Sequence, residues 1–135
     1  MYKNILVPVS FENSKDFEGA LQAARTLADK DAKITLLHVL EQIPSYAISY
    51  VPHDFMEESR KAINERLKQQ AATLKNAVGV LVEGHSGRTI LEWAESNEVD
   101  CIVIASHKPG AADLFLGSTA ARVVRHAQCA VHVVR

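Results

Sequence analysis

The stretch CIVIASHKPGAADLFLGSTAARVVRHAQCAVHVVR, residues 101–135, decides the fold class. Residues 101–105 and 130–134 are short runs of mostly branched apolar side chains, which is typical of strands buried in a parallel sheet. A helix is expected between them over residues 118–127. Strand, crossover helix and next strand form the repeating unit of a parallel α/β sheet.

The preceding hundred residues repeat this unit. Apolar runs predict strands over residues 5–9, 33–40 and 78–84, and helical spacing of apolar residues follows each of them. Asp54, Ser86 and Ser118 stand where helix caps are expected. The order, strand and helix four times and then a strand, predicts an α/β doubly wound parallel sheet of five strands with helices on both faces. With no linker or internal repeat, residues 1–135 are expected to form a single domain.

Composition excludes several function classes. A chain of 135 residues buries enough surface to fold without a metal or disulfide. The net charge of −1 argues against nucleic acid or an anionic membrane as a general partner. Cys101 and Cys129 form no CxxC motif, and we expect buried, reduced thiols. No run has the length of a membrane span or a secretory signal, so we expect a soluble, cytoplasmic protein.

Ligands of open α/β sheets bind beyond the carboxyl ends of the strands, where the strand order switches. That rule selects residues 8–10, the chain after Val39, residues 84–87 and the loop 105–118. The loop is the richest in chemistry, because a helix N-terminus offers amide donors and a partial positive charge to phosphate. The loop and helix start carry His107, Lys108, Gly110, Gly117, Ser118 and Thr119.

The same residues also suit an ordinary helix cap and turn, so both interpretations stay open at this point. The stretch has neither the GxxxxGK[ST] order of a P-loop nor a GxGxxG fingerprint. His107, Asp113 and Ser118 supply the residue types of a hydrolase triad, but without a GxSxG elbow we predict no catalytic site. The histidines show no metal spacing, and no metal site is predicted. Residues 41–53 have no clear period and are expected to form a lid or a partner surface.

The sequence resembles the universal stress protein family over essentially its whole length. The features that carry the resemblance are KNILVPV at the start, ITLLHV in the second strand, EGHSGRTILEWAE after the third, and the ending quoted above. The resemblance implies a flavodoxin-like sheet with strand order 3-2-1-4-5. It also implies a homodimer paired through the last strand, Ala130 to Val134.

Nucleotide-binding members of this family carry the pattern Gly-2x-Gly-9x-Gly-[Ser/Thr]. Gly117 and Ser118 match its end, while Ala105 stands at the first glycine and no residue matches the second. Ser106 and His107 match the intervening dipeptide, and Lys108 matches a commonly basic position. The chain is similar to a subgroup with ASH-basic-Pro at this point, and that similarity still implies adenine-nucleotide binding.

The resemblance places the adenine between Pro8, Val9, Ser10 and Val39, and the ribose near Ala105 and Ser106. It places the phosphates at Lys108, Gly117, Ser118 and Thr119. Ser10 stands where many members have Asp, which lowers the expected affinity by about 1 kcal/mol. The expected ligand is ATP or AMP, with or without Mg²⁺, and the expected role is regulatory rather than catalytic. An interaction module that binds no nucleotide and a slow ATP hydrolase or phosphotransferase are the alternatives.

Overall fold

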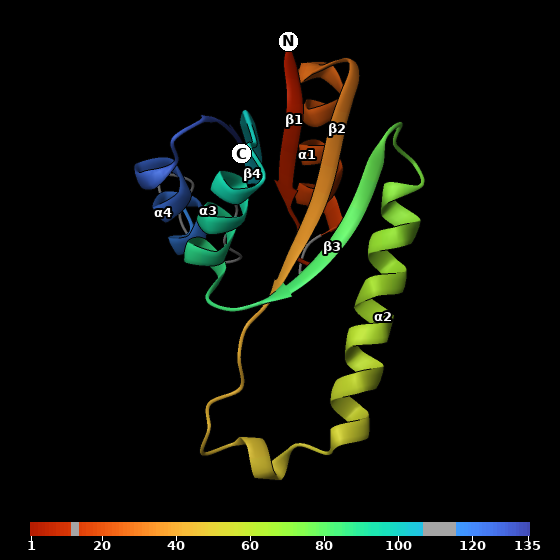
Figure 1. Ribbon diagram of the computed structural model, residues 1–135, viewed down its shortest axis with the longest axis vertical. Helices are drawn as coiled ribbons and strands as arrows, with labels where there is room; N and C mark the ends of the chain where they lie inside the picture. Colours follow the sequence, from red (N-terminus) through yellow and green to blue (C-terminus); the bar gives the residue numbers. More distant parts are fainter. Residues whose placement is uncertain (12–13, 107–115) are drawn as a thin grey trace.

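The computed structural model describes residues 1–11, 14–106 and 116–135. Five parallel strands form one sheet in the order β3-β2-β1-β4-β5, which confirms the predicted doubly wound fold (Figure 1). The elements are β1 (Tyr2–Pro8), α1 (Ser14–Leu27), β2 (Ala28–Leu40), the 3₁₀ helix η1 (Ile48–Tyr50), α2 (His53–Ala71), β3 (Ala77–Glu83), α3 (Ser86–Ser96), β4 (Cys101–Ala105), α4 (Ser118–His126) and β5 (Ala130–Val134).

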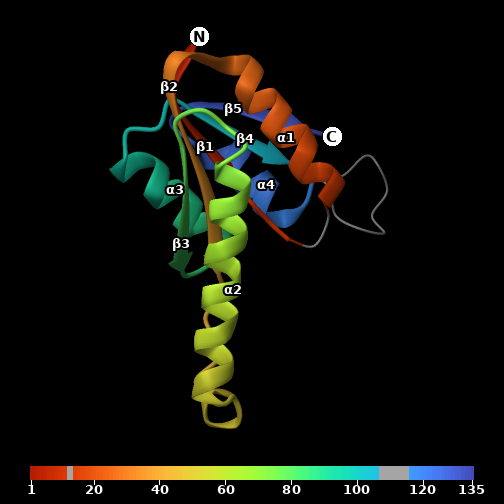
Figure 2. The same cartoon turned by 90° about the vertical axis from the view of Figure 1, so that its right-hand side faces the viewer.

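The sheet separates two apolar cores, because successive side chains of a strand point to opposite faces. Ile5 and Val7 of β1 join the core beneath α1 and α2. Leu6, between them, joins the core beneath α3 and α4. Figures 1 and 2 show these two helix pairs on opposite sides of the sheet. The continuous apolar runs in the sequence therefore reflect strands that are covered on both faces.

A glycine lets α2 lie close to the sheet. A Cβ atom added to Gly79 of β3 would lie 2.6 Å from the Cβ of Leu67 and 3.1 Å from its carbonyl carbon and oxygen. Leu67 is fully buried in α2. Because the neighbouring atoms belong to a helix backbone, they have little room to move, and the position requires glycine.

Asp100 fixes β4 against β1 at the amino ends of these strands. Its carboxylate accepts the main-chain N–H groups of Lys3 at 2.8 Å and Asn4 at 3.0 Å. Its own N–H donates to the Asn4 carbonyl at 3.0 Å. These bonds set the register in which Ile5 pairs with Cys101, so Asp100 holds together the two central strands on which the predicted site depends.

Several boundaries differ from the sequence-based predictions. The strand expected from residue 33 begins at Ala28, because Tyr2 of β1 pairs with Ala28 and the exposed polar residues that follow remain extended. None of the three residues expected to cap a helix, Asp54, Ser86 and Ser118, occupies an N-cap position. The N-cap residues are Pro52, His85 and Gly117, and none of them makes a side-chain cap hydrogen bond. Ser86 instead donates its hydroxyl to Glu41 at 2.9 Å.

Residues 41–55, here called the arm, leave the carboxyl end of β2 and project beyond the sheet (Figures 1 and 2). The segment is not structureless, since it contains η1 and a hydrogen bond from the Ala47 N–H to the Pro44 carbonyl at 2.9 Å. Large apolar side chains are exposed along it: Tyr46, Ile48, Tyr50 and Phe55. Within the described ranges, no helix is long and apolar enough to cross a membrane.

The two thiols differ in environment. Cys101 is buried, as expected, whereas Cys129 is only half-buried because it precedes the edge strand β5. Burial raises the pKa of Cys101 to about 11, with smaller contributions from the charges of Cys129 and Asp100. Burial also raises the pKa of Cys129, against a main-chain hydrogen bond that lowers it.

This difference predicts selective labelling by a thiol reagent. A pKa of about 11 in place of 9.0 lowers the thiolate fraction of Cys101 at pH 8 about a hundredfold, in addition to its burial. The native protein should therefore react at Cys129, and Cys129→Ser should abolish fast labelling until the chain unfolds. The raised pKa also predicts stability that is full below pH 9 and lost as the pH rises through about 11. Fast labelling of native Cys129→Ser would contradict this account.

Candidate functional site

The strand order reverses between β1 and β4, which makes these two strands the switch point of the sheet. Their ladder consists of the pairs Ile5–Cys101 and Leu6–Ile102, whereas the ladder between β1 and β2 runs on to Pro8 and Leu37. Among the described residues, β1 and β4 therefore stop pairing before their carboxyl ends. Of the predicted site residues, Pro8, Val9 and Ser10 lie at the end of β1, and Ala105 and Ser106 lie at the end of β4.

The end of β1 lies against the end of β2. Pro8 is half-buried, Val9 is buried and Ser10 is exposed. The Val9 N–H donates to the Leu37 carbonyl at 2.8 Å, and Val39, half-buried, lies two residues further along β2. The structure thus brings the three residues after β1 close to Val39, although they are far apart in the sequence.

The end of β4 is tied to the start of α4. Ser106 is 7% exposed, its N–H donates to the Val134 carbonyl at 2.8 Å, and its carbonyl accepts the Gly117 N–H at 3.1 Å. Gly117 is the N-cap of α4, followed by the exposed Ser118 and the half-buried Thr119. The first-turn N–H groups of a helix have no acceptor within the helix itself. The bond from Gly117 to Ser106 therefore sets these amide donors beside the end of β4.

Gly117 leaves space at this helix start. Its φ of −60° is accessible to any residue, so the backbone does not require glycine. Among the described residues, the nearest neighbour of a Cβ atom added there would be the Ser106 carbonyl oxygen at 3.6 Å, which is an ordinary contact. With respect to the part of the chain that the structure describes, the absence of a side chain leaves room beside the amides, and that room fits the approach of an anion to a helix N-terminus.

The remaining predicted residues are not placed. His107, Lys108 and Gly110 lie outside the described residues, as does Asp113 of the residue set considered for a triad. No three histidine, cysteine or acidic side chains come together as a metal site in the part of the chain that the structure describes. His85, after β3, is exposed at the N-cap of α3.

A stack of three side chains beside the site was missed by the sequence analysis. The His38 and Phe11 rings lie 4.9 Å apart at 33°, and the Arg66 guanidinium lies 4.2 Å from the centre of the Phe11 ring. The Nδ1 atom of His38 lies 2.7 Å from the Val9 carbonyl oxygen. The three residues come from different elements, so no local pattern could have grouped them.

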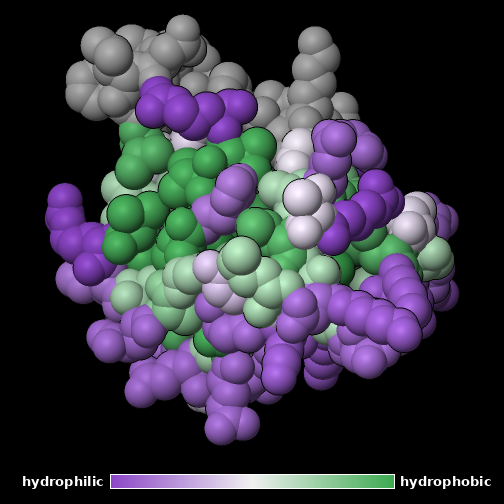
Figure 3. Space-filling model, turned by 90° about the horizontal axis from the view of Figure 1, so that it is seen from above, coloured by the Kyte–Doolittle hydropathy of each residue, from purple (hydrophilic) through white to green (hydrophobic). Residues whose placement is uncertain are grey.

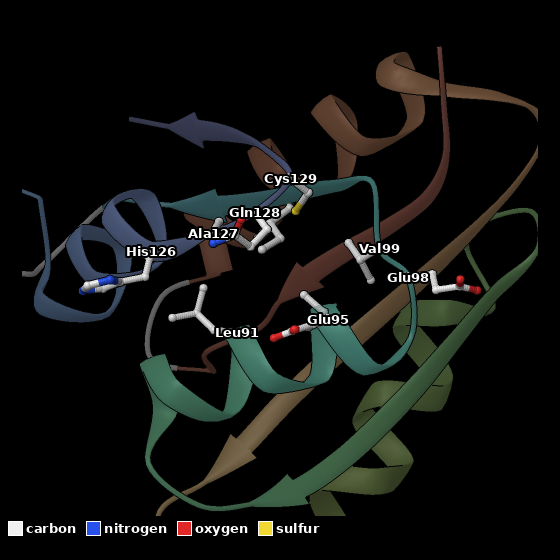
Figure 4. Close-up of a pocket in the computed structure, with 10 residues that line it drawn as sticks. Leu91, Glu95, Glu98, Val99, His126, Ala127, Gln128 and Cys129 are labelled. Carbon is white, nitrogen blue, oxygen red and sulfur yellow. The ribbon is translucent and has the colours of Figure 1, made fainter.

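A pocket of about 290 Å³ lies by the amino ends of β4 and β5, at the opposite end of the strands from the predicted site (Figure 4). Leu91, Val99 and Ile102 contribute apolar walls, and Glu95 and His126 are among its polar residues. None of the predicted site residues lines it. Its position separates it from the switch-point residues described above.

The fold and the position of these residues define a doubly wound α/β domain with its candidate binding residues at the switch point. The chain belongs to the universal stress protein family, whose model matches residues 1–135. Universal stress protein G of Salmonella typhimurium is 35% identical over 147 aligned residues, which cover 100% of both chains. The structure of universal stress protein UspA from Lactobacillus plantarum is 29% identical, with a TM-score of 0.76 over 99% of this chain and 98% of the other.

Some structures with this fold contain adenine nucleotides. A universal stress protein family protein of Arabidopsis thaliana with bound AMP is 18% identical, with a TM-score of 0.66 over 98% of this chain and 90% of the other. Other universal stress protein structures are complexes with cAMP and, from Archaeoglobus fulgidus, with dAMP. Identity at this level shows a shared fold.

Proposed function

We propose that this universal stress protein binds an adenine nucleotide, ATP or AMP, at the switch point and acts as a regulatory protein. The hydrogen bond from Gly117 to Ser106 carries the proposal, because it sets the N-terminus of α4 directly beside the end of β4. In this proposal the base lies by Pro8, Val9, Ser10 and Val39, the ribose by Ala105 and Ser106, and the phosphates by Lys108, Gly117, Ser118 and Thr119.

Electrostatics supports phosphate binding at this place. The N-terminus of α4 carries about half a positive charge, and its first-turn amides point toward a bound anion. Ser118 and Thr119 add hydroxyl donors, and the first turn of α4 contains no acidic residue that would repel a phosphate. Adenine nucleotides in structures of the same fold support the class of ligand. Mg²⁺ would accompany ATP through its phosphates.

We further propose that the chain is one cytoplasmic domain that forms a homodimer through β5. This strand lies at the sheet edge and carries the apolar residues Ala130, Val131, Val133 and Val134. Val131, Val133 and Val134 of this strand are half-buried. Figure 3 shows a face of the molecule on which hydrophobic residues gather in one area bordered by hydrophilic ones. Nucleotide binding would bias one conformation of the loop after β4, and the dimer would transmit the change.

Calorimetric titration tests the proposal. Protein freed of bound nucleotide should bind ATP or AMP saturably, with one site per chain. Phosphate release at saturating ATP and Mg²⁺ tests the alternative of a slow hydrolase or phosphotransferase, for which we expect no turnover above background. Absence of any binding would contradict the proposed function.

A second candidate, an interaction module that binds no nucleotide, is favoured by one observation. Tyr46 and Tyr50 on the arm are 81% and 86% exposed, and Phe55 is 62% exposed. Aromatic side chains exposed together on a projecting segment are typical of interaction surfaces. The titration above separates the candidates, because the interaction module alone would give no heat with ATP or AMP.

A further inference from the structure

The main-chain carbonyl of Val9, the residue that follows β1, has an unusual hydrogen-bond partner. Val9 donates its N–H to Leu37, so the parallel ladder between β1 and β2 reaches Val9. In a continuing ladder the Val9 carbonyl would accept the N–H of Val39, since alternate residues of β2 face β1. The Val9 carbonyl instead lies 2.7 Å from the Nδ1 atom of His38. The side chain of His38 therefore takes the place of the next main-chain hydrogen bond of the ladder, the one from the Val39 N–H to the Val9 carbonyl.

The direction of the Val39 main chain follows from its neighbours. The Leu37 carbonyl faces β1, because it accepts from Val9, and the Leu40 carbonyl faces β3, because it accepts the Gly84 N–H at 3.1 Å. Alternate residues of a strand direct their main-chain groups to the same neighbouring strand, so the N–H and C=O of Val39 face the same side as those of Leu37. Among the described residues, no main-chain hydrogen bond joins Val39 to Val9. A donor and an acceptor at Val39 thus face the switch point side by side.

The imidazole of His38 is held in this position. Since a carbonyl oxygen can only accept, the Nδ1 atom carries the proton that the bond requires. The Phe11 ring covers the imidazole at 4.9 Å, and the Arg66 guanidinium of α2 covers Phe11 in turn at 4.2 Å. His38 is partly buried. The stack fixes the ring, and the ring fixes the Val9 carbonyl.

We propose that His38 is a positioning residue of the nucleotide site and a determinant of base selectivity. By taking the Val9 carbonyl out of the ladder, it leaves the Val39 N–H and C=O to the base. A main-chain donor beside an acceptor complements adenine, whose N1 accepts and whose 6-amino group donates. The same pair of main-chain groups does not match hypoxanthine or guanine. These bases present N1–H as a donor and O6 as an acceptor, so donor would face donor and acceptor would face acceptor. This inference rests on the proposed function.

Two nearly isosteric substitutions test this role. His38→Asn keeps an amide donor near the position of Nδ1, whereas His38→Leu has similar branching and no donor. Calorimetry measures the Kd of wild type and both variants for ATP and for inosine triphosphate. We expect wild type to prefer ATP, His38→Asn to stay within about threefold, and His38→Leu to bind ATP about tenfold more weakly with little change for inosine triphosphate.

The outcomes separate the two proposals. If wild type binds neither nucleotide, the proposed function fails and this inference fails with it. If wild type binds ATP and His38→Leu keeps both its affinity and its preference, or if both variants lose affinity equally for both nucleotides, only the role of His38 is overturned. Thermal unfolding shows whether each variant is folded. Should His38→Leu not fold, His38→Gln, whose donor reaches past the Nδ1 position, takes its place with the same expected loss of selectivity.

Discussion

Gly79→Val should lower the free energy of unfolding by about 3 kcal/mol or more. Even the first carbon of the new side chain would lie 2.6 Å from the Leu67 Cβ atom and 3.1 Å from the Leu67 carbonyl group. Overpacking a tightly packed interior costs roughly 1–3 kcal/mol where side chains can adjust, and occasionally more. Here the obstacle includes the backbone of α2, so the helix itself must move away from β3. Denaturant unfolding followed by circular dichroism measures the effect.

Gly19→Ala is the matched control. A Cβ atom at Gly19 in α1 would lie 3.1 Å from a methyl carbon of Val134, the end of a side chain on an edge strand. The gain in helix propensity from glycine to alanine, about 1 kcal/mol, offsets the small adjustment of that methyl group. We expect a stability close to that of wild type. A Gly79→Val variant as stable as this control would show that α2 does not pack on β3 as described.

Gly117→Asp should weaken ATP binding by at least about a hundredfold while leaving the fold intact. Aspartate is one of the best N-cap residues and interacts favourably with the positive end of the helix dipole, so α4 should gain stability. A Cβ atom at Gly117 would lie 3.6 Å from the Ser106 carbonyl oxygen, its nearest neighbour among residues 1–11, 14–106 and 116–135. The new carboxylate would compete with the phosphates for the same amides and repel them.

Gly117→Asn is the control for this charge effect. Asparagine has the shape of aspartate and caps helices about equally well, but it carries no charge. We expect its Kd for ATP to rise by about tenfold or less. Calorimetry gives the Kd of each variant, and thermal unfolding checks that both are folded. Equal affinities of Gly117→Asp and wild type would mean that the phosphates do not lie at the start of α4.

The fold was predictable because its signals are local and strong. Continuous branched-apolar runs such as residues 101–105 indicate strands covered on both faces, and these runs alternate with amphipathic helices. The strand order came from the family resemblance, and the structure has the same order. The rule that ligands meet the carboxyl ends of strands selected residues 8–10 and the loop after β4 without further information.

Details set by distant contacts were not predictable. The extension of β2 back to Ala28 depends on pairing with Tyr2, and the exposed polar residues within it show no strand pattern. The expected cap at Ser118 was displaced by one residue, because the chain enters α4 through Gly117 bonded to Ser106. The role of His38 depends on Val9, Phe11 and Arg66, which only the folded chain brings together.

The most direct test of the central proposal is to denature the purified protein gently and to identify the released small molecules by chromatography and mass spectrometry. We predict an adenine nucleotide in an amount that approaches one per chain, and its identity will distinguish ATP from AMP as the retained ligand. Protein that releases no nucleotide and also fails to bind added ATP or AMP would contradict the proposal. In that case the start of α4 would be a helix terminus without a ligand.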